Sequence, residues 1–378
     1  MSHIMRPQPL EKMLNWILSE YKENQSIFGI HKSLFFTPRA HAPYATKSLF
    51  GDYLATPIGP AAGPNTQLTQ NILCSWLSGA RFLELKTVQI MDELEFGRPC
   101  IDMEDEGYNA EWSQELKLEQ SIHEYLKAWI LIPVLHRLLG WEKKDSTGMI
   151  FNLSVGYNLE GILSPRMQKF IDTMMDATQE IAAYRDILKK QFPDFADVEV
   201  RNSLVNSCTL STMHGCPPDE IGRIARYLLE ERKFHLTVKL NPTLLGRERV
   251  LGTLRETLGY TAIDIAPAVF EHDLQYPKAM ELITSLKETA KKEDRFFGVK
   301  LSNTLAMTNN RGVMPGEEMY MSGRSLYPLT MNLWRDLSRD LRGDLNVSYS
   351  AGADAKNITM ILSCGALPVT IASDILKP

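Results

Sequence analysis

Two of the five cysteines stand in the segment NSCTLSTMHGCPPDEI, which spans residues 206–221. Cys216 follows His214 closely and precedes two prolines and two acidic residues, a pattern typical of a helix start. The amino end of a helix lowers the pKa of a thiol, and His214 is close enough in sequence to share the proton. These residue types favour Cys216 as the more reactive of the two thiols. Cys208 lies inside or at the end of a predicted strand, where a free cysteine usually packs, and it remains the alternative.

Structural roles for these cysteines are disfavoured by their number and spacing. Five is an odd number, and the chain has no C-x-x-C pair, so neither a disulfide framework nor a zinc site is expected. The first 25 residues carry charges at Arg6, Glu11 and Lys12 and contain no apolar run typical of a signal peptide. We therefore expect a cytoplasmic protein with reduced thiols.

The composition excludes several classes of partner. The 378 residues are 44% hydrophobic and 23% charged, which is typical of a globular protein with a large core. The net charge of -5 is spread along the chain without a basic stripe, so neither a nucleic acid nor a membrane surface is indicated. The most apolar segment, 126–141, is interrupted by charges and is shorter than the roughly 20 residues that a bilayer span needs. We expect a buried helix there and a small-molecule partner for the chain.

Short apolar runs of β type alternate with longer helical runs from residue 53 to residue 373. The candidate strands are 53–59, 81–88, 149–156, 198–211, 236–242, 261–267, 296–303, 346–352 and 368–373. The helices expected between them include 166–190, 219–233, 276–292 and 326–341. Alternation of this kind predicts an α/β fold with a parallel sheet, either a (β/α)8 barrel of the TIM type or a doubly wound sheet.

The positions of the polar residues favour the barrel. Polar, Gly or Pro residues follow the carboxyl end of nearly every predicted strand, whereas a doubly wound sheet gathers its site at one switch point. We therefore predict a helical extension over residues 1–50 and a barrel over 51–378, with a helical insertion around 100–145. Nine strands compete for eight places, so one must be surplus. The chain stops where a closing helix is expected, which suggests a truncated barrel.

Fingerprints of two nucleotide-binding folds are missing, but an anion site of the barrel kind is possible. No G-x-G-x-x-G follows the first predicted strand, and no G-x-x-x-x-G-K-[ST] occurs. The loops after the last two strands of a barrel often bind phosphate, and here they read SAGAD (350–354) and IASDI (371–375). Small residues let backbone N–H groups face an anion, so these loops are the predicted phosphate site.

Several motifs taken in order carry a family resemblance. TPIGPAAGPNTQ, FLELKTV, VKLNP, KLSNT, MYMSGRSLYPLT and the ending SAGAD...CGALPVTIAS resemble the FMN barrels of dihydroorotate dehydrogenases and of dihydropyrimidine dehydrogenase. The sequence is most similar to the N-terminal part of YgfK-like proteins described as selenate reductase subunits, including TLSTMHGCPP and EEMYMSGR. The resemblance implies FMN in this chain. FAD, NAD(P)H and iron-sulfur clusters are then expected only in further domains of a longer polypeptide or a partner subunit.

The resemblance also implies the flavin-binding residues. A lysine inside a barrel points to function, because an unpaired buried charge costs several kcal/mol. Lys239 has a rival in Lys300, which repeats its V-K-L pattern, and the glycine pair of the relatives is Ala351-Gly352 here. The implied flavin contacts are Ala61, Ala62, Gly63, Lys86, Thr87, Lys239 or Lys300, Gly352 and Ser373.

The substrate contacts implied by the resemblance are polar. Asn303 and Thr304 match a pair that binds the heterocycle or flavin, and Asn158 and Glu160 match residues that hold a pyrimidine amide edge. For Asn158 and Glu160 a solvated loop is an equally good interpretation. Reducing an activated C=C requires a proton on the face opposite the flavin, and the relatives supply it from a cysteine after the fourth strand. The resemblance leaves two candidates for this role, because Cys208 matches the Asn-x-Ser-Cys pattern of the family and Cys216 lies in the segment shared with the YgfK-like proteins. The predicted helix start favours Cys216, with His214 as its partner.

These inferences predict an FMN-dependent reductase domain of a larger cytoplasmic complex. Its substrate would be the electron-poor ring C=C of a nucleobase-like heterocycle, such as urate or a pyrimidine. One alternative is a non-catalytic electron relay to a partner such as a molybdenum-containing oxidoreductase, as the name selenate reductase implies. A second alternative is a flavin-free barrel lyase that uses Lys239 as a Schiff base.

Overall fold

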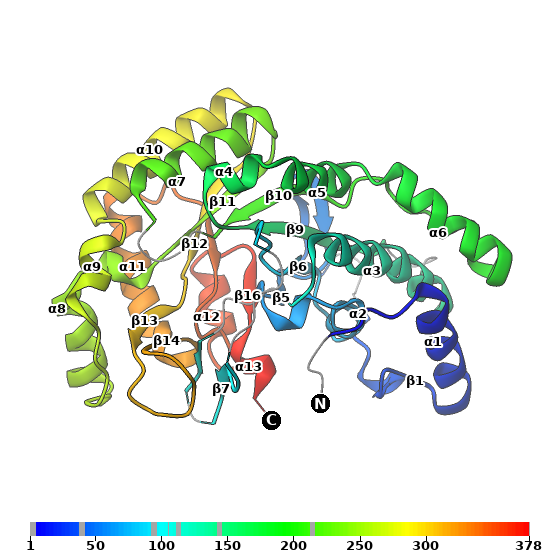
Figure 1. The fold of residues 1–378 in the computed structure, drawn as a ribbon, viewed down its shortest axis with the longest axis horizontal. Coiled ribbons are helices and arrows are strands. Elements are labelled where there is room, and N and C mark those ends of the chain that lie inside the picture. The colour runs from blue at the N-terminus through cyan, green and yellow to red at the C-terminus, as the bar shows by residue number, and fades with distance from the viewer. Residues whose placement is uncertain are drawn as a thin grey trace. The chain divides into compact units, whose positions relative to one another are not determined.

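The computed structural model describes residues 5–37, 42–91, 97–104, 106–110, 115–141, 146–211 and 216–377. The described residues form an eight-stranded parallel sheet with the order β5-β16-β15-β12-β11-β10-β9-β6 (Figure 1). The strands are β5 (Ile58–Pro60), β6 (Phe82–Glu84), β9 (Ile150–Val155), β10 (Val205–Leu210), β11 (His235–Leu240), β12 (Phe297–Leu301), β15 (Val347–Tyr349) and β16 (Val369–Ile371). The predicted (β/α)8 class of the TIM type is confirmed.

Glycine is required where the two strands at the ends of this order meet. Arg81 at the start of β6 donates its backbone N–H to Ile58 O of β5 at 2.9 Å. A Cβ atom at residue 59 would lie 1.5 Å from the carbonyl oxygen of Phe82. Only Gly59 permits this close approach of β5 to β6.

The surplus strand of the sequence pattern is 261–267. This segment is a turn followed by extended chain, and it leads into α9 (Pro267–His272). Ile263 and Ile265 are buried, which explains the alternating pattern. The backbone carbonyl of Ile263 accepts from the guanidinium of Arg255 at 2.7 and 3.1 Å, so a side chain supplies a bond that a neighbouring strand would otherwise make.

The chain divides by its contacts into two compact units, which we describe separately. Unit 1 comprises residues 1–93, 114–153 and 163–206, and unit 2 comprises 94–113, 154–162 and 207–378. The helices of unit 1 are α1 (Leu10–Asn24), α2 (Thr69–Leu77), α3 (Leu118–Leu138), α5 (Pro165–Met175) and α6 (Thr178–Gln191). The predicted helix 166–190 is thus two helices. It breaks where Asp176 Oδ1 accepts from the N–H of Thr178, which starts a new helix.

The helices of unit 2 are α4 (Leu159–Leu163), α7 (Pro218–Arg226), α8 (Arg247–Leu251), α9, α10 (Tyr276–Lys292), α11 (Leu326–Asp340), α12 (Ile358–Ser363) and α13 (Ser373–Leu376). Three of them, α7, α10 and α11, agree closely with the predicted helices 219–233, 276–292 and 326–341. A π-helical turn over Tyr227–Glu231 extends α7. The helices α7 and α10 lie side by side, and α10 also contacts β12 (Figure 1).

Three smaller sheets complete the described chain. Unit 2 holds β7 (Ile101–Asp102), β8 (Tyr108–Asn109), β13 (Leu305–Thr308) and β14 (Glu318–Met321) in the order β13-β14-β8-β7. Part of the segment predicted as a helical insertion around 100–145 is therefore strand, and its helical part is α3. Unit 1 holds the pairs β1 (Ser26–Ile27) with β2 (Ile30–His31) and β3 (Thr46–Leu49) with β4 (Asp52–Leu54). The domain boundary at residue 50 stays a prediction.

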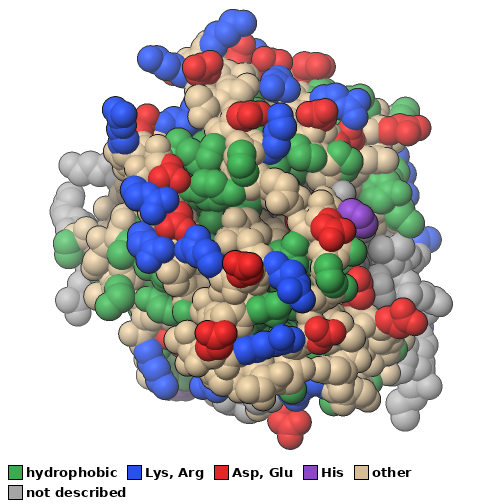
Figure 2. Space-filling view, turned by 90° about the vertical axis from the view of Figure 1, so that its left-hand side faces the viewer, with side chains coloured by type: hydrophobic (Ala, Val, Ile, Leu, Met, Phe, Trp, Pro, Cys, Tyr) green, Lys and Arg blue, Asp and Glu red, His purple; other side chains and the backbone are tan. Residues whose placement is uncertain are grey.

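Two features of the described chain concern nucleic acids and membranes as partners: the charge on one face and the length of the apolar helices. The face of unit 2 that carries α8 and α11 interleaves Lys and Arg with Asp and Glu (Figure 2). Charges of both signs so close together give no extended field of one sign on that face. Among the described helices, none is long and apolar enough to cross a membrane.

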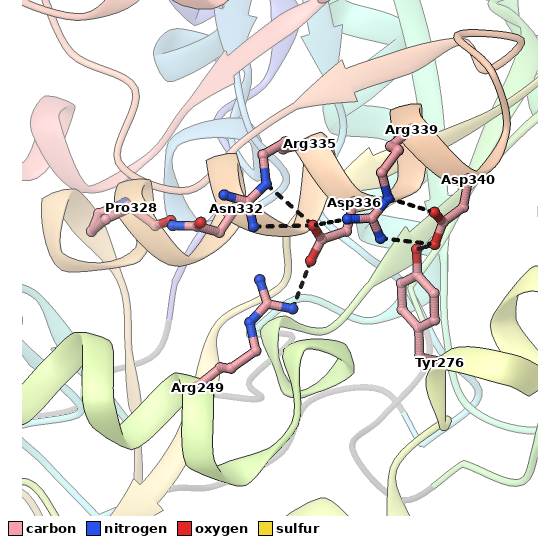
Figure 3. A network of polar contacts seen from close by, with 8 residues as sticks. All are labelled: Arg249, Tyr276, Pro328, Asn332, Arg335, Asp336, Arg339 and Asp340. Atoms are coloured by element: carbon pink, nitrogen blue, oxygen red, sulfur yellow. Dashed lines mark hydrogen bonds and ion pairs between the residues drawn. The ribbon is translucent and has the colours of Figure 1, made fainter.

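A buried carboxylate joins two helices of unit 2. Asp336 on α11 is 5% exposed and accepts from Arg249 of α8 at 2.6 Å and from Arg335 at 3.1 Å (Figure 3). Burial raises the pKa of Asp336, but the hydrogen bonds from Arg249 and Arg335 outweigh it, so the pKa lies below its ordinary value.

We expect Asp336→Asn to lower the free energy of unfolding by about 1–2 kcal/mol at pH 7, because it removes charge-assisted hydrogen bonds between α8 and α11. A carboxylate with a lowered folded pKa stabilises the fold above its unfolded pKa of about 4, and this contribution is lost as pH falls through the folded pKa. The difference from wild type, measured by urea unfolding, should therefore shrink below about pH 4. Asp344→Asn is the control, because Asp344 pairs with Lys287 while 84% exposed. An equal loss in both variants would contradict the account.

Candidate active site

The register of three strands in unit 2 brings the two rival lysines together. Lys239 of β11 pairs with Lys300 of β12, and Lys300 pairs with Ser348 of β15. Paired residues of parallel strands point to the same face, with the strands about 4.8 Å apart. Lys300 is 1% exposed, and Lys239 is half-buried. The sequence left open which lysine serves the site, and the register places both in one row, which we call the lysine row.

The opposite face of these strands identifies where the lysine row points. Leu240, Leu301 and Tyr349 form the next row of the register. Tyr349 packs against Trp334 of α11, with ring centroids 6.0 Å apart. Because successive side chains alternate between the two faces of a sheet, the side chains of the lysine row point away from α11 and toward the interior of the barrel.

The same register separates the two cysteines. Cys208 of β10 pairs with Leu236, whereas its neighbour Thr209 pairs with Thr237, which shares a face with Lys239. Cys208 therefore lies on the face turned toward the helices, and it is fully buried. This position fits the predicted packing role for Cys208.

Cys216 stands on the loop that follows β10, directly before α7. Burial, and then the negative charge of Glu220, raise the pKa of its thiol to about 11. The predicted lowering by the helix start is therefore wrong. Glu220 and Asp219 fill the first turn of α7 and offset the positive end of the helix dipole. The predicted partner His214 lies outside the described residues.

The raised pKa makes the reactivity of Cys216 testable. We expect iodoacetamide to label this half-buried thiol slowly at pH 7.5, and we expect the rate to rise about tenfold per pH unit until the pH nears 11. Mass spectrometry of the peptide around Cys216 across pH 7–11 measures this dependence. Exposed Cys364 provides the internal comparison. A plateau in the Cys216 rate near pH 8 would contradict the assignment.

Asn158 and Glu160 follow β9 and are both exposed. Asn158 Oδ1 accepts from the N–H of Gly161 at 2.8 Å, which caps the short helix α4. The N–H of Leu159 donates to Glu220 Oε1 at 2.8 Å, so this loop is tied to the start of α7 beside Cys216. The structure brings these predicted residues near one another, with the Asn158 side chain already in a local bond.

Asn303 and Thr304 follow β12 directly. The backbone N–H of Asn303 donates to Leu240 O at 2.8 Å, and its Oδ1 accepts from the N–H of Thr304 at 3.0 Å. Asn303 is 9% exposed, and its Nδ2 donates to no residue that the structure describes. The Nδ2 group can therefore donate to an acceptor on a ligand.

The predicted phosphate loops meet a third segment that the sequence reasoning left without a role. Ser373 Oγ donates to Ser322 Oγ at 3.0 Å. A Cβ atom at Gly352, where φ is +73°, would lie 2.5 Å from the carbonyl oxygen of Gly323 and 2.8 Å from Arg324 Cα. We call residues 322–323, 352–353 and 373 the cradle. The signal for 322–323 was present in MYMSGRSL, where small residues follow a strand.

The donors of the cradle suit an anion. The backbone N–H groups of Gly352 and Ala353 donate to no residue within the described ranges. Asn357 stabilises the loop 351–354: its Nδ2 donates to Gly352 O at 2.7 Å, and its Oδ1 accepts from the N–H of Asp354. Fixed backbone donors of this kind bind phosphate without side-chain charge. Ala351 has φ +84°, a conformation that glycine adopts more readily than alanine.

Unit 1 holds the remaining predicted flavin contacts. Lys86 is 8% exposed, and its backbone carbonyl accepts from Tyr125 Oη at 3.3 Å. Glu84, two residues earlier, is 1% exposed and accepts from the N–H of Ala62 at 3.3 Å. Sequence reasoning did not assign a role to Glu84, although a carboxylate inside a barrel strand is a functional signal.

Gly63, another predicted flavin contact, differs from Gly59 because nothing in the described chain requires glycine there. Its φ of 179° is ordinary extended backbone. An added Cβ would meet only Ala61 O, at the ordinary contact distance of 3.8 Å. Neither conformation nor packing within the chain therefore requires glycine at position 63. Ala61, Ala62 and Thr87 lie on the same two loops after β5 and β6.

Comparisons with known proteins agree with this fold. A family model described as "Oxidoreductase YgfK, N-terminal TIM-barrel domain" matches residues 28–378. Two relatives from strains of Escherichia coli, each named "Putative oxidoreductase YgfK", are 48% identical over 100% of this chain, which spans 38% of their length.

Two solved structures of DHODH from Eimeria tenella, one ligand-free and one with ferulenol, have TM-scores of 0.52 and 0.53. Their identities are 13% and 14%, and the matches cover 97% and 98% of this chain and 89% and 87% of theirs. At such identity they support the fold alone. The family match and the relatives at 48% identity go further, and the chain belongs to the family of N-terminal TIM-barrel domains of oxidoreductase YgfK.

Proposed function

We propose that this domain binds FMN and reduces an activated ring C=C of a nucleobase-like heterocycle. The observation that carries the proposal is the lysine row together with the cradle, which lie on adjoining strands and loops of one unit. A row of two ammonium groups suits a ligand that gains negative charge, and backbone N–H groups suit its phosphate.

The donor set fits FMN. Gly352 and Ala353 would hold the phosphate with their N–H groups, with the hydroxyls of Ser322 and Ser373 beside them. Lys239 and Lys300 would stabilise negative charge on the ring. When bound, FMN supplies the two-electron reduction. Ala61, Ala62, Gly63, Lys86 and Thr87 keep their assignment to FMN from the likeness of the sequence to flavin barrels.

Cys216 is the proposed proton donor. Its raised pKa keeps the thiol protonated at neutral pH, so Sγ has a proton to give to the ring carbon. The thiolate that forms would regain a proton from water or from His214. Glu220 opposes the charge on that thiolate, which favours rapid reprotonation.

The substrate proposal rests on amide recognition. Asn303 Nδ2 would donate to a ring carbonyl, with Thr304 adjacent, and Asn158 and Glu160 would contact the imide edge. Urate and pyrimidines present these carbonyl and N–H groups. A hydrogen-bonding site discriminates strongly against rings that lack the matching groups.

The electron source lies outside this chain in the proposal. The relatives are longer than the chain, which leaves room for further domains in them. We propose that flavin and iron-sulfur domains of a longer polypeptide or a partner subunit, with FAD and NAD(P)H, deliver electrons in the cytoplasm.

Single-turnover oxidation tests the function. The FMN-loaded domain is reduced anaerobically with dithionite and mixed with urate, uracil, thymine or buffer. The proposal predicts that at least one heterocycle reoxidises the flavin faster than buffer does, with formation of the dihydro product. If none does, the reductase function is wrong, and the relay of electrons to a protein partner takes its place.

A further inference from the structure

An ion pair between Arg324 and Glu106 lies next to the backbone of the cradle. Arg324 Nε lies 3.0 Å from both carboxylate oxygens of Glu106, and Nη2 lies 2.8 Å from Oε1. This bidentate geometry is among the strongest that side chains form. Glu106 is 5% exposed, whereas the Arg324 side chain is 63% exposed. Nothing in the proposed chemistry uses either residue.

The backbones beside the pair interlock with the cradle. The N–H of Ser322 donates to Gly107 O at 2.7 Å, so the residue after Glu106 binds the first cradle residue. A Cβ atom at Gly323 would lie 3.3 Å from Glu106 O and 3.4 Å from Ser373 Cβ. Glu106–Gly107 therefore packs against 322–323, the segment that Gly352 also approaches.

The carboxylate of Glu106 is stabilised where it lies. Burial raises the pKa of Glu106, but hydrogen bonds from Arg324 and Tyr260 outweigh burial and hold the pKa below its ordinary value. The pair is thus charged throughout the neutral range. It ties the β7–β8 segment to the turn between β14 and α11 by a contact that spans 218 residues of sequence.

We infer that Glu106 and Arg324 are positioning residues that fix the Ser322–Gly323 backbone against Gly352 and Ser373, and so set the affinity of the cradle for the phosphate of FMN. This inference rests on the proposed function. Neither side chain touches the ligand in this account. Their effect is specific to the phosphate, because the lysine row and Asn303 stand on other elements.

FMN and riboflavin differ only by the phosphate, so their affinities separate this role from a general one. We expect Arg324→Ala and Glu106→Gln to weaken FMN binding roughly tenfold to a hundredfold, measured by flavin fluorescence titration. Riboflavin binding should change less than about twofold, and Arg324→Lys should restore part of the loss. Arg166→Ala is the matched control, because Arg166 makes an equally bidentate pair with Glu119 in unit 1.

A second readout needs no flavin. Hydrogen exchange of the Ser322 amide, which is bonded to Gly107 O, should be faster in Glu106→Gln than in wild type and unchanged in Arg166→Ala. If the variants weaken FMN and riboflavin equally, or leave both affinities and the exchange rate unchanged, the positioning role is wrong while the flavin proposal stands. If the wild-type domain binds neither FMN nor riboflavin, both the proposed flavin binding and this inference are wrong.

Discussion

Replacing Cys216 with alanine is expected to slow reduction of the heterocycle by about a hundredfold to ten-thousandfold, the range that a positioned general acid contributes. FMN retention should be unchanged, since Cys216 belongs to neither the lysine row nor the cradle. Single-turnover oxidation of the reduced domain measures the rate. The wild-type rate should stay flat from pH 6 to 9 and fall as pH approaches 11, because the donor must be protonated and its pKa is about 11.

Cys208→Ala supplies the comparison for that result. Cys208 is fully buried on the helix-facing side of β10, so its loss should lower stability by about 1 kcal/mol or more and leave the rate within about twofold. The opposite pattern, with a slow Cys208→Ala and a normal Cys216→Ala, would transfer the proton donor to Cys208. A slow Cys216→Ala with lost FMN would instead indicate misfolding of the loop.

Gly352→Ala is expected to weaken FMN binding by more than about a hundredfold. The added Cβ would lie 2.5 Å from Gly323 O, and the residue is held at φ +73°, so the cradle backbone must shift. Backbone donors that move by about 1 Å no longer converge on a phosphate. Fluorescence titration with FMN measures the loss, and riboflavin should be affected far less.

The control for strain alone is Gly343→Ala. Gly343 has nearly the same φ, +76°, but nothing lies within 4 Å of its Cβ position. It should lose about 1 kcal/mol of stability and keep FMN affinity. Ala351→Gly should also keep FMN affinity, because it relieves a residue at φ +84°. If Gly352→Ala and wild type bind FMN with equal affinity, the cradle is not the phosphate site.

Periodicity and strand endings predicted most of this barrel, and its failures have physical causes. The buried alternation of Ile263 and Ile265 imitates a strand, although the Arg255 side chain takes the backbone bond. The helix 166–190 contains no proline to mark its break at Asp176, whose side chain accepts from the N–H of Thr178. Both outcomes depend on tertiary partners that a local pattern does not contain.

In the candidate site, too, residue types could be predicted from the sequence, whereas contacts between distant segments could not. The sequence predicted a functional role for Lys239 or Lys300 as alternatives, and only the register showed that they are neighbours. The helix start after Cys216 was correct, yet the pKa of the thiol is raised and not lowered, because burial and the charge of Glu220 oppose the thiolate. The contacts that join Gly323 and Glu106 run between distant segments, so the local pattern did not indicate them.

Flavin binding by the wild-type domain decides whether this barrel is a flavoprotein. The purified chain is incubated with FMN, passed through gel filtration and examined by visible absorbance, and the flavin is identified after acid release. The account predicts about one FMN per chain that co-elutes with the protein and is lost in Gly352→Ala. A folded wild-type chain that elutes without flavin absorbance would contradict it.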